Sequence, residues 1–437
     1  MVESNRLTIH HTGYTPEERS PELTEQYYGI KKSSTALNYE EQQGQLFALM
    51  DQSVQRRLVS DVPLGTFLSG GIDSSVVSAL AARHTKHLKT FSIGFKDEPL
   101  FDETRYANLV ARKIGSDHTV FSLTTDDLYN NLHDVLDYLD EPFADSSALN
   151  VHILSRYTRE HVTVALSGDG ADELFGGYNK HAAELKIREG GLAASLIAML
   201  DPLWSLMPQS RNSGIGNKAR QLKKFSEGMK FSAKERYWNW AGYATEKQCG
   251  ALLKGNLLDS FDHLKDYSAR KDEILRFIHE NGDLNEVFQT DMELVLVNDM
   301  LMKVDLMSMA NSLEVRTPFL DYTVVDFAFS LPVESKIDRH GRKKIVRDAF
   351  RKLLPAELYS RGKQGFEVPL LKWFRTELKS MITGDLLSEK LVAEQGIFNF
   401  EEIQKLLDRL YSSSPGDAVA RVWGLIVFQY WWKKNLR

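Results

Sequence analysis

Two short polar turns, each placed directly after an apolar run, constrain the fold of this chain more than any other feature of its 437 residues. The turn SGGIDSS covers residues 69–75 and follows the apolar run 62–68, and the turn SGDGADE covers residues 167–173 and follows the apolar run 162–166. Each run is typical of a buried strand, and helical patterning follows each turn. A strand, a glycine turn and a helix therefore occur twice, which favours parallel strands joined by helices.

The rest of the first half alternates in the same way. Further strands are expected at residues 90–95 and 118–123, and helices at residues 39–58, 75–84, 103–114, 126–139 and 149–160. This alternation predicts an α/β fold with a parallel sheet and helices on both faces. Ligands bind such sheets beyond the carboxyl ends of the strands, where both glycine turns fall.

The chain divides into three parts by its pattern. Residues 1–38 lack sustained periodicity and predict an extended lead-in, residues 39–185 carry the α/β core, and helical patterning dominates residues 186–437. The apolar stretch 422–432 predicts a terminal helix that packs on the core, because its interior contains polar and aromatic residues.

Composition points to small-molecule chemistry. The 54 basic and 60 acidic residues give a net charge of −6, which argues against a broad nucleic-acid-binding face. Cys249 is the single cysteine, so neither a disulfide framework nor a cysteine-based zinc site is expected. No signal-peptide pattern and no run long enough to span a membrane occurs, and we expect a cytoplasmic protein that binds neither nucleic acid nor membranes.

The first turn has the composition of a phosphate-binding loop. Backbone N–H groups at the start of a helix attract anions, two adjacent glycines allow a close approach, and serine hydroxyls add donors. The turn lacks the GxxxxGK[ST] and GxGxxG patterns, so neither an ordinary P-loop nor a dinucleotide site is predicted. The structural alternative is a tight turn before a helix capped by Asp73 or Ser74.

The second turn is unusual because three of its seven residues are acidic. Clustered carboxylates raise one another's pKa unless a cation offsets them, and Mg²⁺ is often held by one or two carboxylates together with substrate phosphates. The turn therefore predicts a magnesium site. The alternative is a solvated acidic turn in which Asp169 or Asp172 caps the following helix.

SGGIDSS resembles the pyrophosphate loop of the ATP pyrophosphatases (the PP-loop or adenine nucleotide alpha hydrolase-like fold), and the preceding VPLGTFL resembles asparagine synthetases and β-lactam synthetases in particular. The resemblance implies a five-stranded parallel sheet, ATP as a substrate and Mg²⁺ bound by Asp73. It further implies phosphate contacts from Ser69, Gly70, Gly71, Ser74 and Ser75, and an adenine and ribose pocket at Leu68 and Ile93.

SGDGADE is similar to the family motif SG[ED]GADE, which implies Asp172 as a second magnesium ligand and Ser167 and Gly168 as nucleotide contacts. Asp169 falls where the family places the acidic residue of amide formation. Its side chain is one methylene shorter than the glutamate of many members, so its reach is in question. The segment 139–150 falls at the family's acceptor pocket, which implies substrate contacts from Asp145 and Ser146.

The helical part carries two further blocks. Residues 298–321 combine apolar positions with charged Lys303, Asp305, Glu314 and Arg316, which need a partner or a ligand beside such neighbours, and they resemble the family block that ends in E-x-R-x-PFLD. Lys343 and Lys363 match the family's two lysines that neutralise pyrophosphate and the adenylation transition state. The KQGF turn around Lys363, with its flanking glycines, predicts a loop that closes over ATP.

These resemblances imply an asparagine synthetase-like ligase that adenylates a carboxylate, most readily aspartate, and transfers ammonia to give asparagine, AMP and pyrophosphate. Val2 stands where glutamine-dependent members have a catalytic cysteine, so no glutaminase activity is expected from this chain. Ammonia is expected to come from solution or from a separate glutaminase, and a homodimer is left open. The alternatives are amidation of a uronic acid or peptide carboxylate, closure of a β-lactam ring, or a regulatory protein that only binds nucleotide.

Overall fold

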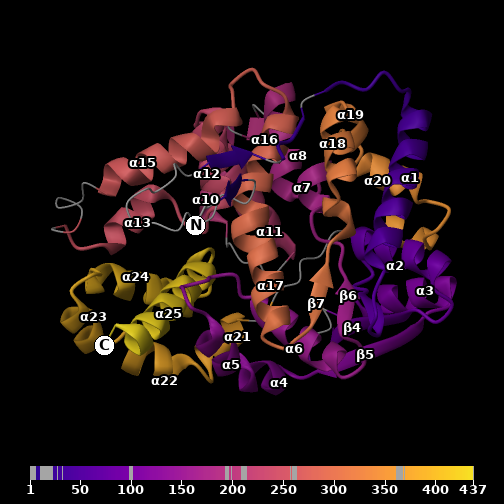
Figure 1. Ribbon diagram of the computed structural model, residues 1–437. Coiled ribbons are helices and arrows are strands. Elements are labelled where there is room, and N and C mark those ends of the chain that lie inside the picture. The colour runs from indigo at the N-terminus through magenta and orange to yellow at the C-terminus, as the bar shows by residue number, and fades with distance from the viewer. Residues whose placement is uncertain are drawn as a thin grey trace, which may run out of the picture.

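Five parallel strands, in the order β5-β4-β3-β6-β7, form the main sheet of this computed structural model, at the lower right in Figure 1. Their bounds are β3 Leu64–Phe67, β4 Lys89–Phe95, β5 Asp117–Leu123, β6 Val164–Leu166 and β7 Glu314–Arg316. The first four strands coincide with the four predicted apolar runs, which confirms the α/β fold with a parallel sheet.

The structure describes residues 6–9, 23–26, 28–31, 33–97, 102–191, 196–197, 199–207, 214–255, 257, 263–360, 368 and 370–436. In the first half the helices are α1 Tyr39–Arg57, α2 Ile72–His84, α3 Thr104–Ile114, α4 Thr125–Asn130, α5 Leu132–Tyr138, α6 Ala148–Arg159, α7 Ala171–Phe175 and α8 Asn179–Glu189. The single helix expected over 126–139 is wrong, because Asn131 ends α4 and its side chain donates to the Asp127 carbonyl at 2.7 Å.

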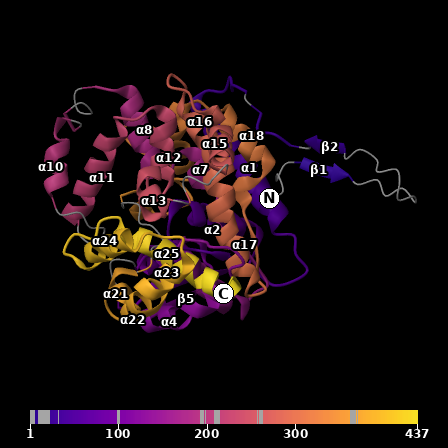
Figure 2. The same cartoon turned by 90° about the vertical axis from the view of Figure 1, so that its left-hand side faces the viewer.

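The strand β7 lies in the part of the chain where the pattern predicts helices. Its three residues, with a charged residue at each end, are too short and too polar to show a strand pattern. Pairing with β6, from Val164 opposite Glu314 to Leu166 opposite Arg316, makes this segment a strand. The predicted lead-in also contains a small antiparallel sheet of β1 Arg6–Ile9 and β2 Leu23–Gln26, which lies to one side of the helices in Figure 2.

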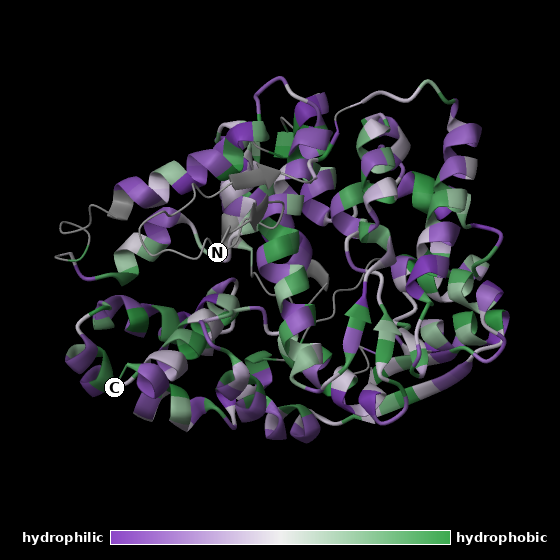
Figure 3. Ribbon diagram, viewed as in Figure 1, coloured by the Kyte–Doolittle hydropathy of each residue, from purple (hydrophilic) through white to green (hydrophobic). Residues whose placement is uncertain are grey.

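Alternate residues of the sheet enter two separate hydrophobic clusters. Phe91, Ile93 and Ala165 pack with α4, α5, α6 and the last helices of the chain, whereas Leu68 and Leu166 pack with α1, α2, α3 and two later helices, α18 Tyr322–Ser330 and α20 Lys344–Ala349. Both faces of the sheet are therefore covered by helices, as expected for parallel strands. Figure 3 shows the matching stripes of hydrophobic and hydrophilic residues on these helices.

One composite helix runs along the middle of the molecule without interruption. It begins as α16 Leu284–Asp291, continues as the π-helix η2 Met292–Leu301 and ends as α17 Met302–Met309. Val304 and Met307 of α17 are buried, as expected of its apolar positions, but Met309 is 52% exposed. A ten-residue π-helix is rare, and such segments occur frequently at functional sites.

Helices also make up most of the remaining chain. Those between the first half and η2 are α10 Asp201–Leu206, α11 Gly214–Gly228, α12 Ala233–Ala241, α13 Glu246–Leu252 and α15 His263–Ile274 with η1 Leu275–Phe277. Those after β7 are η3 Pro318–Leu320, α18, α19 Val333–Lys336, α20, η4 Ala356–Tyr359, α21 Leu370–Arg375, α22 Lys379–Met381, η5 Ile382–Leu386, α23 Glu389–Gln395, α24 Phe400–Tyr411 and α25 Ala418–Asn435.

The terminal helix α25 packs on the core, as its sequence predicts. Val422, Trp423 and Ile426 are buried in the same cluster as β4 and α6. In the part of the chain that the structure describes, no helix combines the length and apolarity that crossing a membrane requires.

Candidate functional site

The first glycine turn joins β3 to α2 and lies between α2 and α3. Gly70 has a φ of 75°, and a Cβ there would lie 2.5 Å from the backbone nitrogen of Ala107 in α3, so only glycine fits. Gly71 precedes α2 and has no side chain to cap it, so the first N–H groups of this 13-residue helix are available to an anion. The local geometry is therefore that of a phosphate cradle.

The serines of this turn differ in what they can reach. The hydroxyls of Ser69 and Ser74 lie 3.0 Å apart and are part-buried, at the mouth of the turn. Ser75 is fully buried, and its N–H donates to the Gly71 carbonyl within the helix. Ser69 and Ser74 are thus placed for contact with a ligand, and Ser75 is turned into the core.

The second turn, between β6 and α7, lies directly against the first. A Cβ at Gly168 would lie 2.7 Å from the backbone nitrogen of Ser74 and 2.9 Å from Cβ of Asp73, so the two turns touch. They meet because β3 and β6 are neighbours in a parallel sheet and both end at the same edge. The hydroxyl of Ser167 donates to Asp169 at 2.7 Å, which orients this carboxylate.

Lys343 joins the two turns. Its Nζ forms ion pairs with Asp73, 270 positions away, and with Asp172, at 2.7 Å. Its backbone has a φ of 53°, unusual for a residue with a side chain, and its N–H donates to the carbonyl of Phe175 at 3.2 Å. Lys343 therefore has a strained backbone and is also the residue whose ammonium group contacts both carboxylates.

Burial would remove the charge of Lys343, but the carboxylates of Asp172 and Asp73 outweigh it and raise the pKa of this ammonium group. Gly177 makes the arrangement possible, because any side chain there would overlap Oδ1 of Asp172 and Cε of Lys343. The sequence gives no direct signal for Gly177 beyond its place in the segment FGGY that follows SGDGADE. Two carboxylates that converge on one point, beside a phosphate cradle, fit Mg²⁺ bound together with nucleotide phosphates.

The other residues predicted for the nucleotide fall at the same edge of the sheet. Leu68 is fully buried and its N–H donates to the Phe91 carbonyl at 2.8 Å. Ile93 is 7% exposed and lies in the neighbouring strand β4. Lys363 and the glycines around it, Gly362 and Gly365, lie outside the described residues, so their placement stays a prediction.

Asp169 is partly buried and is affected by charges of both signs. Burial raises the pKa of its carboxyl, with a further contribution from Asp172, whereas the Ser167 hydroxyl and the positive charge of Lys303 act in the opposite direction. Lys303 itself pairs with Asp145 at 2.7 Å. The predicted acceptor residue Asp145 thus pairs with a lysine whose charge also acts on Asp169.

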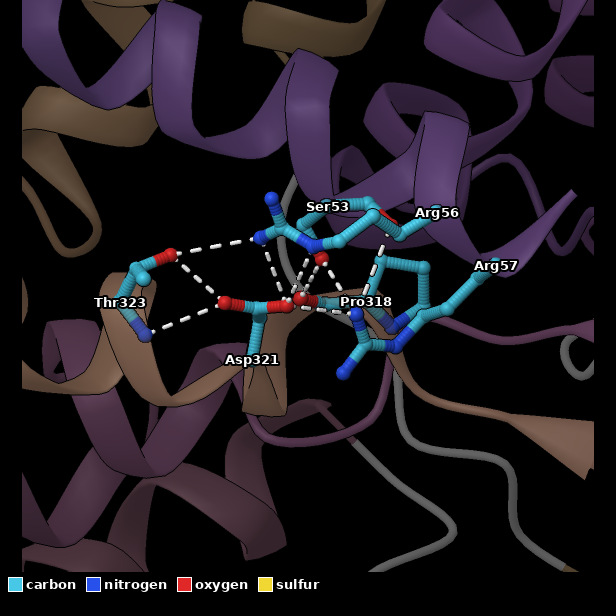
Figure 4. Close-up of polar contacts among 6 residues, drawn as sticks. All are labelled: Ser53, Arg56, Arg57, Pro318, Asp321 and Thr323. Atoms are coloured by element: carbon cyan, nitrogen blue, oxygen red, sulfur yellow. Dashed lines mark hydrogen bonds and ion pairs between the residues drawn. The ribbon is translucent and has the colours of Figure 1, made fainter.

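Asp321, the last residue of the E-x-R-x-PFLD block, joins the segment after β7 to α1 (Figure 4). Asp321 accepts from Arg57 at 2.8 Å and from Arg56, and the Ser53 hydroxyl donates to the Pro318 carbonyl at 2.7 Å. These contacts support the second turn.

Two further residues of the E-x-R-x-PFLD block contact the second turn and the end of α1. Leu320 packs against Gly170, and Arg316 donates to the carbonyls of Arg57 and Val59, each at 2.8 Å. Arg316 also pairs with Glu314 at 2.6 Å, so both charges have partners within the protein and neither needs a ligand.

Comparison with known proteins gives a consistent result. A family model described as asparagine synthase matches residues 45–433. The chain is 30% identical over 388 residues to asparagine synthetase [glutamine-hydrolyzing] 1 of Bacillus subtilis (strain 168), covering 88% of this chain and 58% of that protein. It is 32% identical over 407 residues to a putative asparagine synthetase [glutamine-hydrolyzing] of Mycobacterium tuberculosis (strain ATCC 25618 / H37Rv), covering 89% of this chain and 57% of that protein.

A more distant relative carries a different name. The chain is 22% identical over 408 residues to amidase chry2 of Gibberella zeae (strain ATCC MYA-4620 / CBS 123657 / FGSC 9075 / NRRL 31084 / PH-1), covering 85% of this chain and 59% of that protein. In each of these comparisons the chain spans somewhat more than half the length of the relative that it matches.

Proposed function

The chain belongs to the asparagine synthase family, and from this premise we propose that it uses ATP to convert a carboxylate, aspartate in the first place, into its amide. One observation carries the proposal: Asp73 and Asp172, from turns at the ends of two neighbouring parallel strands, both pair with Lys343 beside an uncapped helix N-terminus. Phosphate donors, two carboxylates for a metal and a buried cation are the groups that transfer of an adenylyl group requires.

In the proposed adenylation step, a carboxylate oxygen of the acid forms a bond to the α-phosphorus of ATP, and the bond to the β-phosphate oxygen breaks. The backbone N–H groups of the first turn and the hydroxyls of Ser69 and Ser74 hold the departing pyrophosphate. Asp73 and Asp172 would hold Mg²⁺, which when bound neutralises charge on the phosphate oxygens. Lys343, kept charged by its two carboxylates, supplies a fixed cation, and Lys363 is proposed as a second.

In the proposed amide-forming step, the nitrogen of ammonia attacks the acyl carbon and AMP leaves with its phosphate oxygen. The nitrogen then loses a proton, and Asp169 is the proposed acceptor because Ser167 orients its carboxylate. Ammonia from solution or from a separate glutaminase serves this step equally, since the nitrogen enters in the same form.

The proposal is tested by exchange of labelled pyrophosphate into ATP, measured with a panel of carboxylic acids. We expect exchange with aspartate, and asparagine with AMP when ammonium is added. Exchange with another acid alone, such as a uronic acid, would keep the adenylation and replace the substrate. If ATP bound but no acid supported exchange, the chain would be a nucleotide-binding protein without this activity.

A further inference from the structure

Arg342 is a partly buried cation whose hydrogen-bond partners among the described residues are both neutral. Its Nη1 donates to the carbonyl of Gly177 at 3.1 Å and to Oδ1 of Asn179 at 2.5 Å. In the described part of the chain no carboxylate forms an ion pair with it, whereas its neighbours Lys343 and Lys344 both have one. A guanidinium group has five N–H donors, so the donors on Nε and Nη2 are available to an anion.

The surroundings of Arg342 give it an excess of positive charge. Burial lowers the pKa of its guanidinium group, the charge of Asp172 opposes this change, and the charge of Arg347 adds to it. The carboxylate of Asp172 already pairs with Lys343 at 2.7 Å, so Arg342 has no carboxylate of its own among the described residues. Because a buried cation is costly unless an anion pairs with it, we expect a ligand to supply that anion.

Gly177 places Arg342 beside the proposed nucleotide site. A Cβ on Gly177 would overlap Oδ1 of Asp172 and Cε of Lys343, so the backbone that accepts from Arg342 is in contact with both side chains. Lys343 also follows Arg342 directly in the chain. The guanidinium group is therefore held next to the residues proposed to bind phosphate and Mg²⁺.

The order of the strands indicates which end of a nucleotide is closest to Arg342. Ile93, at the predicted adenine and ribose pocket, lies in β4, Asp73 follows β3 and Asp172 follows β6. These strands are consecutive neighbours, so a nucleotide with its base at β4 and its phosphates at the two turns extends toward β6. Gly177, which accepts from Arg342, comes after the second turn and α7. The phosphate farthest from the base, the γ-phosphate, is therefore the group expected closest to Arg342.

We propose that Arg342 binds the γ-phosphate of ATP through its Nε and Nη2 donors and thereby makes the site prefer ATP over ADP. This inference rests on the proposed use of ATP and adds a residue that determines nucleotide specificity. Asn179 and the carbonyl of Gly177 orient the planar guanidinium group, as recognition of a phosphate by several donors requires. A contact between arginine and phosphate is charge-assisted and strong, and ADP ends one phosphate short of it.

Binding of ATP, ADP and AMP to the wild-type protein and to Arg342→Met tests the proposal. Isothermal titration calorimetry with Mg²⁺ present measures each affinity. We expect Arg342→Met to bind ATP at least tenfold more weakly, since a hydrogen bond between charged groups accounts for about that much. ADP and AMP should bind within about twofold of their wild-type affinities, because neither has a γ-phosphate. An equal loss for all three nucleotides would assign a structural role to Arg342 and overturn the inference.

Three further variants separate the contact from the fold. Arg342→Lys keeps the charge and is expected to recover most of the ATP affinity that Arg342→Met loses. Asn179→Ala removes an acceptor that orients the guanidinium group, so ATP should bind about threefold more weakly and ADP as in the wild type. Arg339→Met is the matched control, because Arg339 is 76% exposed and pairs with Glu189. The same loss of ATP affinity in Arg339→Met would reduce the effect to general surface charge and contradict the assignment.

Failure of the inference and failure of the proposed function give different results. If no carboxylic acid supports pyrophosphate exchange, the proposed amide synthesis is wrong, and the ratio of ATP to ADP affinity in Arg342→Met still decides the role of the arginine. If exchange occurs and Arg342→Met keeps the wild-type affinity for ATP, the proposed function stands and the inference is wrong.

Discussion

Two clusters of the same composition, each with one buried lysine and two aspartates, differ in how their charges are balanced. In the cluster around Lys343 both carboxylates pair with the lysine. In the cluster of Lys303, Asp145 and Asp299, only Asp145 pairs with the lysine, and burial together with the charge of Asp145 raises the pKa of Asp299 to about 7. The two carboxylates of the first cluster thus share one cation, whereas in the second cluster burial and the charge of Asp145 both disfavour the charged form of Asp299.

The largest loss of activity and stability is expected for Lys343→Met, in the first cluster. The substitution leaves Asp73 and Asp172 facing each other without a cation and removes a positive charge from the proposed phosphate site. We expect pyrophosphate exchange to fall by about 10²–10³-fold and the free energy of unfolding to fall by about 3 kcal/mol. Lys344→Met, at the next and more exposed position, is the control in exchange assays and urea unfolding. Exchange within threefold of wild type would show that Lys343 is structural.

Gly177→Ala tests the same cluster without removing a charge. Its Cβ would overlap Asp172 and Lys343, so one of the two side chains must move. Exchange should fall by about 10²-fold, because groups that act in a transition state lose most of their effect when displaced by an ångström. Gly384→Ala, where a Cβ meets nothing within 4 Å, is the control. If pyrophosphate exchange is unchanged in Gly177→Ala, the close approach of Asp172 and Lys343 is not required for the activity.

Lys336 is a third buried lysine, and unlike Lys343 and Lys303 it forms no ion pair in the described part of the chain. Its Nζ donates to Asn285 at 2.8 Å and lies over the rings of Phe288 and Phe329, and burial lowers its pKa to about 7. Since the unfolded chain binds the proton more tightly, stability should rise as the pH increases from about 7 to about 10.5.

Lys336→Met is therefore expected to stabilise the protein by about 2 kcal/mol at pH 7, less than the full pKa shift implies because Asn285 loses a donor. Urea unfolding of both proteins at pH 7 and pH 9.5 measures this, and the difference should shrink at the higher pH. Destabilisation of similar size at both pH values would contradict the lowered pKa of Lys336.

The smallest effect is expected at Asp299. Its folded-state pKa lies above the unfolded value, so the group reduces stability progressively as the pH rises from about 4 to about 7, and the reduction persists above pH 7. Asp145 adds to this effect, whereas Lys303 and Lys180 oppose it. Asp299→Asn should stabilise the protein by about 1 kcal/mol at pH 8 and leave it unchanged at pH 4. Unfolding curves with the same pH dependence as wild type would contradict the raised pKa.

The sequence predicted the parts of the fold that depend on local pattern. Four strands could be predicted because apolar runs of five to seven residues are bounded by polar residues, and α1 because its apolar residues recur at helical spacing. The strand β7 was not readable, because Glu314–Arg316 becomes a strand only through its partner β6. The π-helix was not readable either, because its apolar and charged residues fit an ordinary helix equally well.

The candidate site also has features that the sequence predicted and features that only the structure shows. Both glycine turns could be assigned a place at the carboxyl edge of the sheet, since each follows a predicted strand. The contact between Gly168 and Ser74, and the role of Gly177, depend on how closely the two turns approach each other. The charged residues Glu314 and Arg316 were predicted to need partners, and only the structure shows that these partners belong to the protein itself.

By itself the sequence determined a parallel α/β sheet with two polar glycine turns at one edge, because glycine geometry, helix starts and strand patterns are local properties of the chain. The tertiary structure alone decided which charges meet: Lys343 with two aspartates, and Lys303 with Asp145, 158 positions away. The reason is that electrostatic energy and pKa values depend on distance and burial in space, and neither is encoded by separation along the chain.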